Sequence, residues 1–110
     1  MTNATSRRDA HSARVILRRI RGRDAAFGAQ VDPVVTTMGA ALTDLLGMLP
    51  EEPSQQLTDE LGRVVTTLRT ADCALDQGNE SGTIQLLELA QARLARFIAR
   101  VEELCRRDQD

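Results

Sequence analysis

The chain has 110 residues and a formal net charge of −2, which is enough for one domain with a modest core. Hydrophobic residues make up 42% of it and exclude an intrinsically disordered chain, while aromatic residues make up only 2% and disfavour a site that stacks on bases or sugars. All 14 basic residues are arginine, a bias that a GC-rich genome explains, although arginine also binds carboxylates and phosphates more specifically than lysine.

A first, two-faced helix is predicted over residues 7–22, after five small polar residues, 1–5, that we expect to be disordered. Apolar residues between Ala10 and Ile20 recur at helical spacing and form one face. Basic residues occupy the other face, so this helix is the strongest candidate for binding a partner. The candidate partner-binding residues are Arg7, His11, Arg14, Arg18, Arg19, Arg21 and Arg23.

A bend or a break is predicted between Gly22 and Gln30, because this stretch holds two glycines and glycine is unfavourable inside a helix. Asp32 and Pro33 then indicate a restart, since aspartate caps helices and proline suits the first helical position. The second helix, 33–49, is apolar over much of its circumference and is expected to be the most buried element. The segment Pro50-Glu51-Glu52-Pro53 ends it.

The remaining chain, 54–106, predicts a long antiparallel helical hairpin. Ser54 is placed to cap a helix over 54–77, Gly78 is placed for a left-handed turn, and a last helix runs over 82–106. Leucine, valine and alanine recur along both arms at steps of four and three, so each arm must bury one face.

These patterns predict an all-α fold for residues 1–110, a single bundle of four helices dominated by the hairpin. At the helical rise per residue the hairpin helices span about 36 and 38 Å, longer than the two helices before them. Part of the hairpin's apolar face would then stay exposed in a monomer. We therefore expect a homodimer.

The two cysteines, Cys73 and Cys105, are predicted to be unpaired and buried as small apolar residues. A turn near residue 80 would hold their thiols more than ~20 Å apart, beyond the reach of a disulfide. Free thiols, and the lack of an apolar N-terminal run resembling a signal peptide, favour a cytoplasmic location. Asp44 interrupts the most apolar segment, so no membrane span is expected.

The sequence predicts no catalytic residue, no metal site and no cofactor. His11 is the only histidine and has no carboxylate placed to orient it, and neither cysteine has the spacing of a zinc ligand. Asp72 and Asp76 share a helix face, as a cation site or an arginine-binding strip would require, although a solvated face is the commoner explanation.

Charge is unevenly distributed along the chain. Residues 1–23 hold seven arginines against one aspartate, a net of +6, whereas residues 24–80 hold ten acidic residues against two arginines, a net of −8. The basic helix has four possible roles: a solvated face completing the bundle, a membrane-surface helix, a nucleic-acid contact, or docking on an acidic surface such as residues 51–80. Docking on protein needs the fewest further assumptions.

We therefore expect a non-enzymatic protein–protein interaction module, an adaptor, chaperone or regulatory protein, that acts through helix faces as a homodimer. The partner would be another protein, with an acidic surface. The alternative is a nucleic-acid-associated regulator; it would use Arg7, Arg14, Arg18, Arg19, Arg21 and Arg23. Helical hairpins recur in secretion chaperones, anti-activators and coiled-coil adaptors, but that similarity is architectural and carries no residue motif.

Overall fold

The computed structural model describes residues 2–49 and 54–109, with side chains over 6–49 and 54–107. These residues form four helices and no strand, which confirms the predicted all-α bundle. The helices are α1 (Thr2–Gly22), α2 (Ala25–Met48), α3 (Gln55–Asp76) and α4 (Glu80–Gln109). The bundle is elongated, with Cα extents of 48 × 24 × 17 Å.

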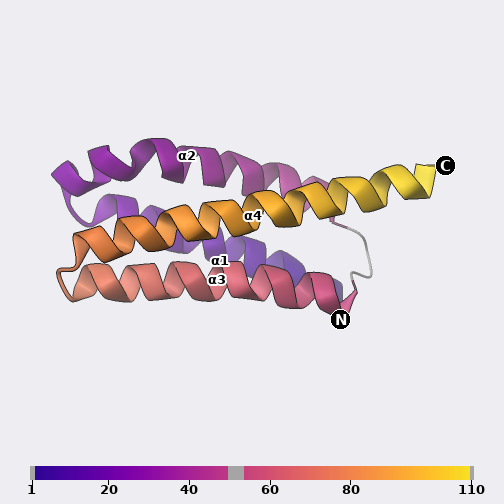
Figure 1. The fold of residues 1–110 in the computed structure, drawn as a ribbon, viewed down its shortest axis with the longest axis horizontal. Coiled ribbons are helices and arrows are strands. Elements are labelled where there is room, and N and C mark those ends of the chain that lie inside the picture. The colour runs from indigo at the N-terminus through magenta and orange to yellow at the C-terminus, as the bar shows by residue number, and fades with distance from the viewer. Residues whose placement is uncertain (1, 50–53, 110) are drawn as a thin grey trace.

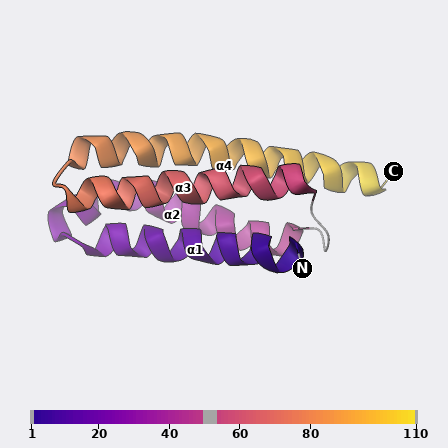
Figure 2. The ribbon, with the colours of Figure 1, turned by 90° about the horizontal axis from the view of Figure 1, so that it is seen from below.

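The four helices occupy the corners of a square bundle (Figures 1 and 2). In the part of the chain that the structure describes, α1 packs on α2 and α3, and α4 packs on α2 and α3, so α2 and α3 stand at opposite corners. Chain directions alternate along the sequence, and α3 and α4 lie side by side in opposite directions, as expected of the predicted hairpin (Figures 1 and 2). This arrangement gives α1 two neighbours, one of which is the acidic helix α3.

The core consists almost entirely of aliphatic side chains, which fill the space between the four helices. The predicted stripe positions Leu61, Leu68, Leu87 and Leu94 are each no more than 2% exposed. The second predicted helix is not the most buried element, because seven residues of the 24 in α2 are buried, against eight of the 22 in α3. One side of α2 carries small residues that face solvent, and these residues line a groove beside α1.

Helix ends follow the capping residues that the sequence shows. The Ser54 side chain accepts a hydrogen bond from the Leu57 amide at 3.2 Å, as predicted for the start of α3. Gly78 has a φ of 77°, the left-handed conformation predicted for it after α3. The side-chain oxygen of Asn79 accepts from the Gly82 amide at 2.9 Å, so α4 begins at Glu80 rather than at residue 82.

The break predicted between Gly22 and Gln30 is wrong for most of its length, because α2 begins at Ala25. The restart predicted at Asp32 and Pro33 is wrong as well, because α2 continues through both residues. Asp24 is its N-cap, with the side chain accepting from the Phe27 amide at 3.0 Å. Gly28 is buried where α2 passes α1; a Cβ there would lie 2.2 Å from the carbonyl oxygen of Arg21. Gly28 therefore permits a close helix approach rather than a bend.

The observed helix lengths differ from those that predicted a homodimer. α1 and α2 have 21 and 24 residues and match the 22 of α3, so only α4, with 30 residues and a length of about 45 Å, extends past its neighbours (Figure 1). Of the apolar stripe, Leu104 near the end of α4 stays 39% exposed. Residues 2–5, expected to be disordered, are helical backbone, while Met1 and the helix-ending segment 50–53 lie outside the described residues.

The close approach at Gly28 predicts opposite effects for two identical substitutions in α2. Gly28→Ala should lower the free energy of unfolding by about 1–3 kcal/mol, because the backbone oxygen of Arg21 has to move. Gly39→Ala should raise it by about 0.5–1 kcal/mol, because nothing lies within 4 Å of its added Cβ and alanine favours helix. Urea unfolding followed by circular dichroism measures both. A neutral Gly28→Ala would contradict the proposed contact.

Candidate functional site

Two of the predicted partner-binding arginines pair with carboxylates of α3. Arg19 lies 3.7 Å from a carboxylate oxygen of Asp72, and Arg23 lies 3.3 Å from the other oxygen and pairs also with Asp76. Asp72 is only 9% exposed, so its charge is balanced by arginines rather than by bulk water. The Asp72–Asp76 face is therefore an arginine-binding strip, which fixes the C-terminal end of α1 and the link after it to α3.

The other predicted residues of α1 form a basic row that lies beside α2. Their spacing alternates between four and three residues, which places all of them on one helix face. At one end Arg7 donates to the carbonyl of Leu46, one of the last carbonyls of α2, which lack an intrahelical donor. At the other end Arg21 lies 3.5 Å from Asp32. The basic row comprises Arg7, His11, Arg14, Arg18 and Arg21.

The side chains of Arg14 and Arg18, in the middle of the basic row, have neither a hydrogen bond nor an ion pair within the described part of the chain. They stand over a groove of about 340 Å³ between α1 and α2. Leu17 and Val35 form its apolar floor, and small residues form its far wall. The groove is lined by Arg14, Leu17, Arg18, Arg21, Val35, Thr36, Gly39, Ala40 and Thr43.

His11 is exposed and continues the basic row between Arg7 and Arg14. Neighbouring Asp9 is half-buried toward α3, where desolvation raises its pKa above the ordinary value even though Arg69 and Arg8 act in the opposite direction. Asp9 thus belongs to the packed side of α1, while His11 belongs to the side that lies open beside α2.

A second basic cluster lies between α3 and α4 and was not predicted. Arg93, Arg96 and Arg100 are spaced by three and four residues on α4 and meet Arg63 of α3 in one groove. The net charge of residues 81–110 is zero, and this sum concealed that three arginines share a face. Helical spacing applied to the charged residues alone would have revealed the three on α4, but not the arginine that α3 adds.

Both cysteines are free, as predicted, but only one is shielded. Cys73 is exposed, contrary to the expectation of a buried residue, because it lies one position beyond the buried face that ends with Ala71 and Asp72. Cys105 is half-buried, with its sulfur 3.8 Å from the carbonyl oxygen of Met48.

Within residues 2–49 and 54–109, no three histidine, cysteine or acidic residues gather in a way that could hold a metal ion. Over the same ranges, no helix combines the length and the apolarity that crossing a bilayer requires.

Comparison with protein-family models, with curated proteins and with solved structures finds no match to this chain.

The contact between α1 and α3 predicts that Asp72 contributes more to the stability of the bundle than Asp32 does. Asp72→Asn should lower the free energy of unfolding by about 1–3 kcal/mol, because a buried group that holds two arginines loses its charge. Asp32→Asn should change it by less than about 0.5 kcal/mol, because its pair with Arg21 is exposed. Equal effects in chemical denaturation would show that the arginine-binding strip does not stabilise the bundle.

The raised pKa of Asp9 predicts a pH-dependent effect of neutralising it. Because its pKa is higher in the folded protein than in the unfolded chain, the contribution of Asp9 to stability falls as the pH rises through these values. Asp9→Asn should therefore stabilise the protein at neutral pH, and the gain should vanish below the ordinary pKa of 3.8. Thermal unfolding between acid and neutral pH tests this, with Asp44→Asn, an exposed carboxylate, as the control for net charge.

Proposed function

We propose that this chain is a non-enzymatic protein-interaction module that receives an acidic helical segment of a partner protein in the groove between α1 and α2. The proposal rests on one observation: some arginines of the N-terminal segment are paired with carboxylates, and others are not. Arg19 and Arg23 are balanced by carboxylates of the same chain, whereas Arg14 and Arg18 stand over a groove with no acidic group in its lining. Carboxylates of a partner would complete this side of the bundle.

The shape of the groove favours a helix as its occupant. The small residues on its far wall, Thr36, Ala40 and Thr43, repeat at steps of four and three, as the basic row does on the near wall. Two adjacent helices with this repeat form a platform on which a third helix packs, apolar residues inward and charged residues over the rim. Small side chains let the backbone of that helix approach closely. Acidic residues at the same repeat would meet Arg14 and Arg18.

An adaptor, chaperone or regulatory role fits a module of this kind, and the choice among them depends on the partner. The homodimer stays a prediction, and of the difference in helix length that motivated it only the extension of α4 past its neighbours remains. Nucleic-acid binding is less favoured than before, because three of the six arginines it would use are in ion pairs: Arg19, Arg21 and Arg23.

The proposal is tested with the full chain and a labelled synthetic helical peptide. The peptide carries glutamates at alternating steps of four and three along one face and alanines and leucines on the other. Fluorescence polarisation should show saturable binding that weakens with salt. The double variant Arg14→Gln, Arg18→Gln should weaken it by about tenfold or more, since two charge-assisted contacts of together ~1.5–3 kcal/mol are lost.

The matched control is Arg106→Gln, Arg107→Gln, which removes the same charge from the far end of α4 and should change the affinity by less than about twofold. A version of the peptide with glutamine in place of glutamate should not bind. If both double variants lost the same affinity for the peptide, the effect would come from net charge alone, and binding in the groove would be refuted. Random duplex DNA is titrated in parallel. The nucleic-acid alternative would replace the proposal if the duplex bound more tightly than the peptide and if this binding were abolished in the double variant Arg14→Gln, Arg18→Gln.

A further inference from the structure

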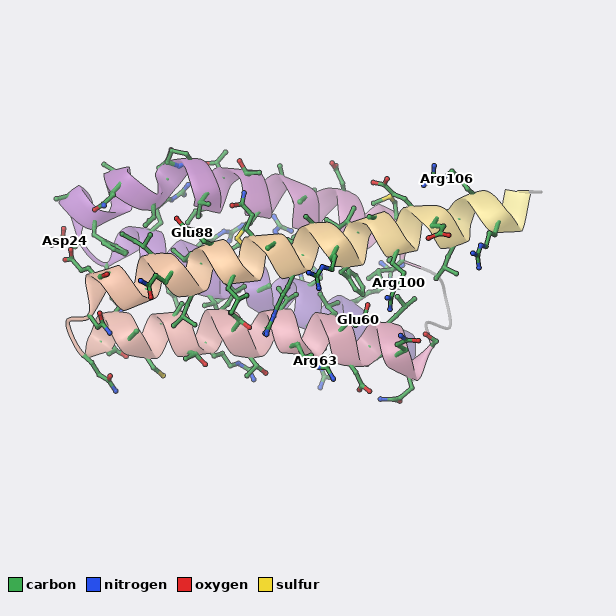
Figure 3. All side chains as sticks on the ribbon, in the orientation of Figure 1. Asp24, Glu60, Arg63, Glu88, Arg100 and Arg106 are labelled. Carbon is green, nitrogen blue, oxygen red and sulfur yellow. The ribbon has the colours of Figure 1, made fainter. Side chains whose placement is uncertain are left out.

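The basic cluster between α3 and α4 is independent of the α1–α2 groove and differs from it in form. Arg93, Arg96 and Arg100 line one wall of a groove of about 240 Å³, and Glu60 and Arg63 line the other. Figure 3 shows Arg100 of α4 and Glu60 of α3 close together, with Arg63 further along α3. Four guanidinium groups and one carboxylate give this groove a net charge of +3.

The existing contacts hold the cluster in place without neutralising it. Arg100 pairs with Glu60, the only carboxylate in the lining. Arg93 donates to the hydroxyl of buried Thr67 at 2.8 Å, a neutral acceptor that positions the guanidinium but leaves its charge. The guanidinium groups of Arg63 and Arg96 have neither a hydrogen bond nor an ion pair within the described residues. Like charges three and four residues apart repel one another, and this repulsion would be relieved by a bound anion.

The charge and the size of the groove define the anion. A phosphoryl group carries about −1.5 to −2 charges near neutral pH, so one or two of them match the net charge of +3. Guanidinium groups bind phosphate oxygens through paired N–H donors, and helices on two sides offer them from two directions. The volume is below the ~300–1,000 Å³ of sites for drug-sized ligands. The only aromatic residue in the lining, Phe97, is 2% exposed and offers no face for a base.

We propose that the groove between α3 and α4 binds a small phosphate, such as orthophosphate or pyrophosphate, through Arg63, Arg93, Arg96 and Arg100. Arg93 and Arg100 are held in position by Thr67 and Glu60, and Arg63 and Arg96 supply the groups that close on the ligand. The site lies on the opposite pair of helices from the α1–α2 groove, so it does not depend on the proposed protein docking.

Isothermal titration calorimetry with the full chain at low salt tests the site, with orthophosphate, pyrophosphate and citrate as probes. One equivalent of pyrophosphate should bind, more tightly than orthophosphate or citrate. Arg96→Gln should weaken pyrophosphate binding by about tenfold or more, and Arg63→Gln, on the other helix, should do the same. Both residues are exposed, so neither variant should unfold the bundle, which circular dichroism checks.

Arg106→Gln is the matched control, an exposed arginine on the same helix outside the groove (Figure 3), and should leave pyrophosphate binding unchanged. Arg14→Gln, Arg18→Gln should leave it unchanged as well, which separates this site from the protein-docking groove. Three results would overturn the proposal: no heat of binding up to about 1 mM pyrophosphate, equal weakening by Arg96→Gln and Arg106→Gln, or tighter binding of citrate than of pyrophosphate.

Discussion

The contact between Gly28 and the backbone of Arg21 constrains how the first two helices meet. With a hydrogen in place of a side chain, the start of α2 lies against the end of α1, where a Cβ would be 2.2 Å from a carbonyl oxygen. Only Arg23 and Asp24 separate the two helices, and Asp24 caps α2. This contact sets the register of α1 against α2, and thereby the position of the basic row beside the small residues of α2.

The arginines of the N-terminal segment face two different neighbouring helices. Arg19 and Arg23 point to the carboxylates of α3, where Asp72 is nearly buried, and help to hold the two halves of the bundle together. The basic row faces the other neighbour, α2, whose groove wall offers hydroxyl and methyl groups and no carboxylate. A net charge of −2 therefore coexists with two arginine-lined grooves on different helix pairs. The distribution of charge over the surface, rather than its sum, carries the functional argument.

Much of the fold could be predicted from the sequence, because each helix must bury one face and the spacing of its apolar residues reveals that face. Leu61, Leu68, Leu87 and Leu94 are core residues for this reason. The region from Ala25 to Pro33 could not be predicted in the same way. Its glycine and proline cost about 1 and 3 kcal/mol in helix propensity, and these costs are offset by the Asp24 cap and by burial of Phe27 and Val31. Such compensation appears only when the partner helix is known.

The sequence predicts a site on a single helix more readily than a site that two helices form together. The basic row lies on a single helix, so its helical spacing is visible in the sequence. The α3–α4 groove combines Arg63 with residues some 30 positions later, and that proximity depends on the register of two helices. The separation of Arg14 and Arg18 from Arg19 and Arg23 likewise depends on which neighbour each side of α1 faces.

The exposed thiol of Cys73 has a consequence for handling this protein. A solvent-accessible thiol forms intermolecular disulfides when an oxidant is present, whereas Cys105 is partly shielded next to Met48. Two molecules joined through Cys73 would migrate as a covalent pair without any packing between their helices. A size measurement made in the absence of a reducing agent would therefore report on sulfur chemistry and not on the affinity of one bundle for another.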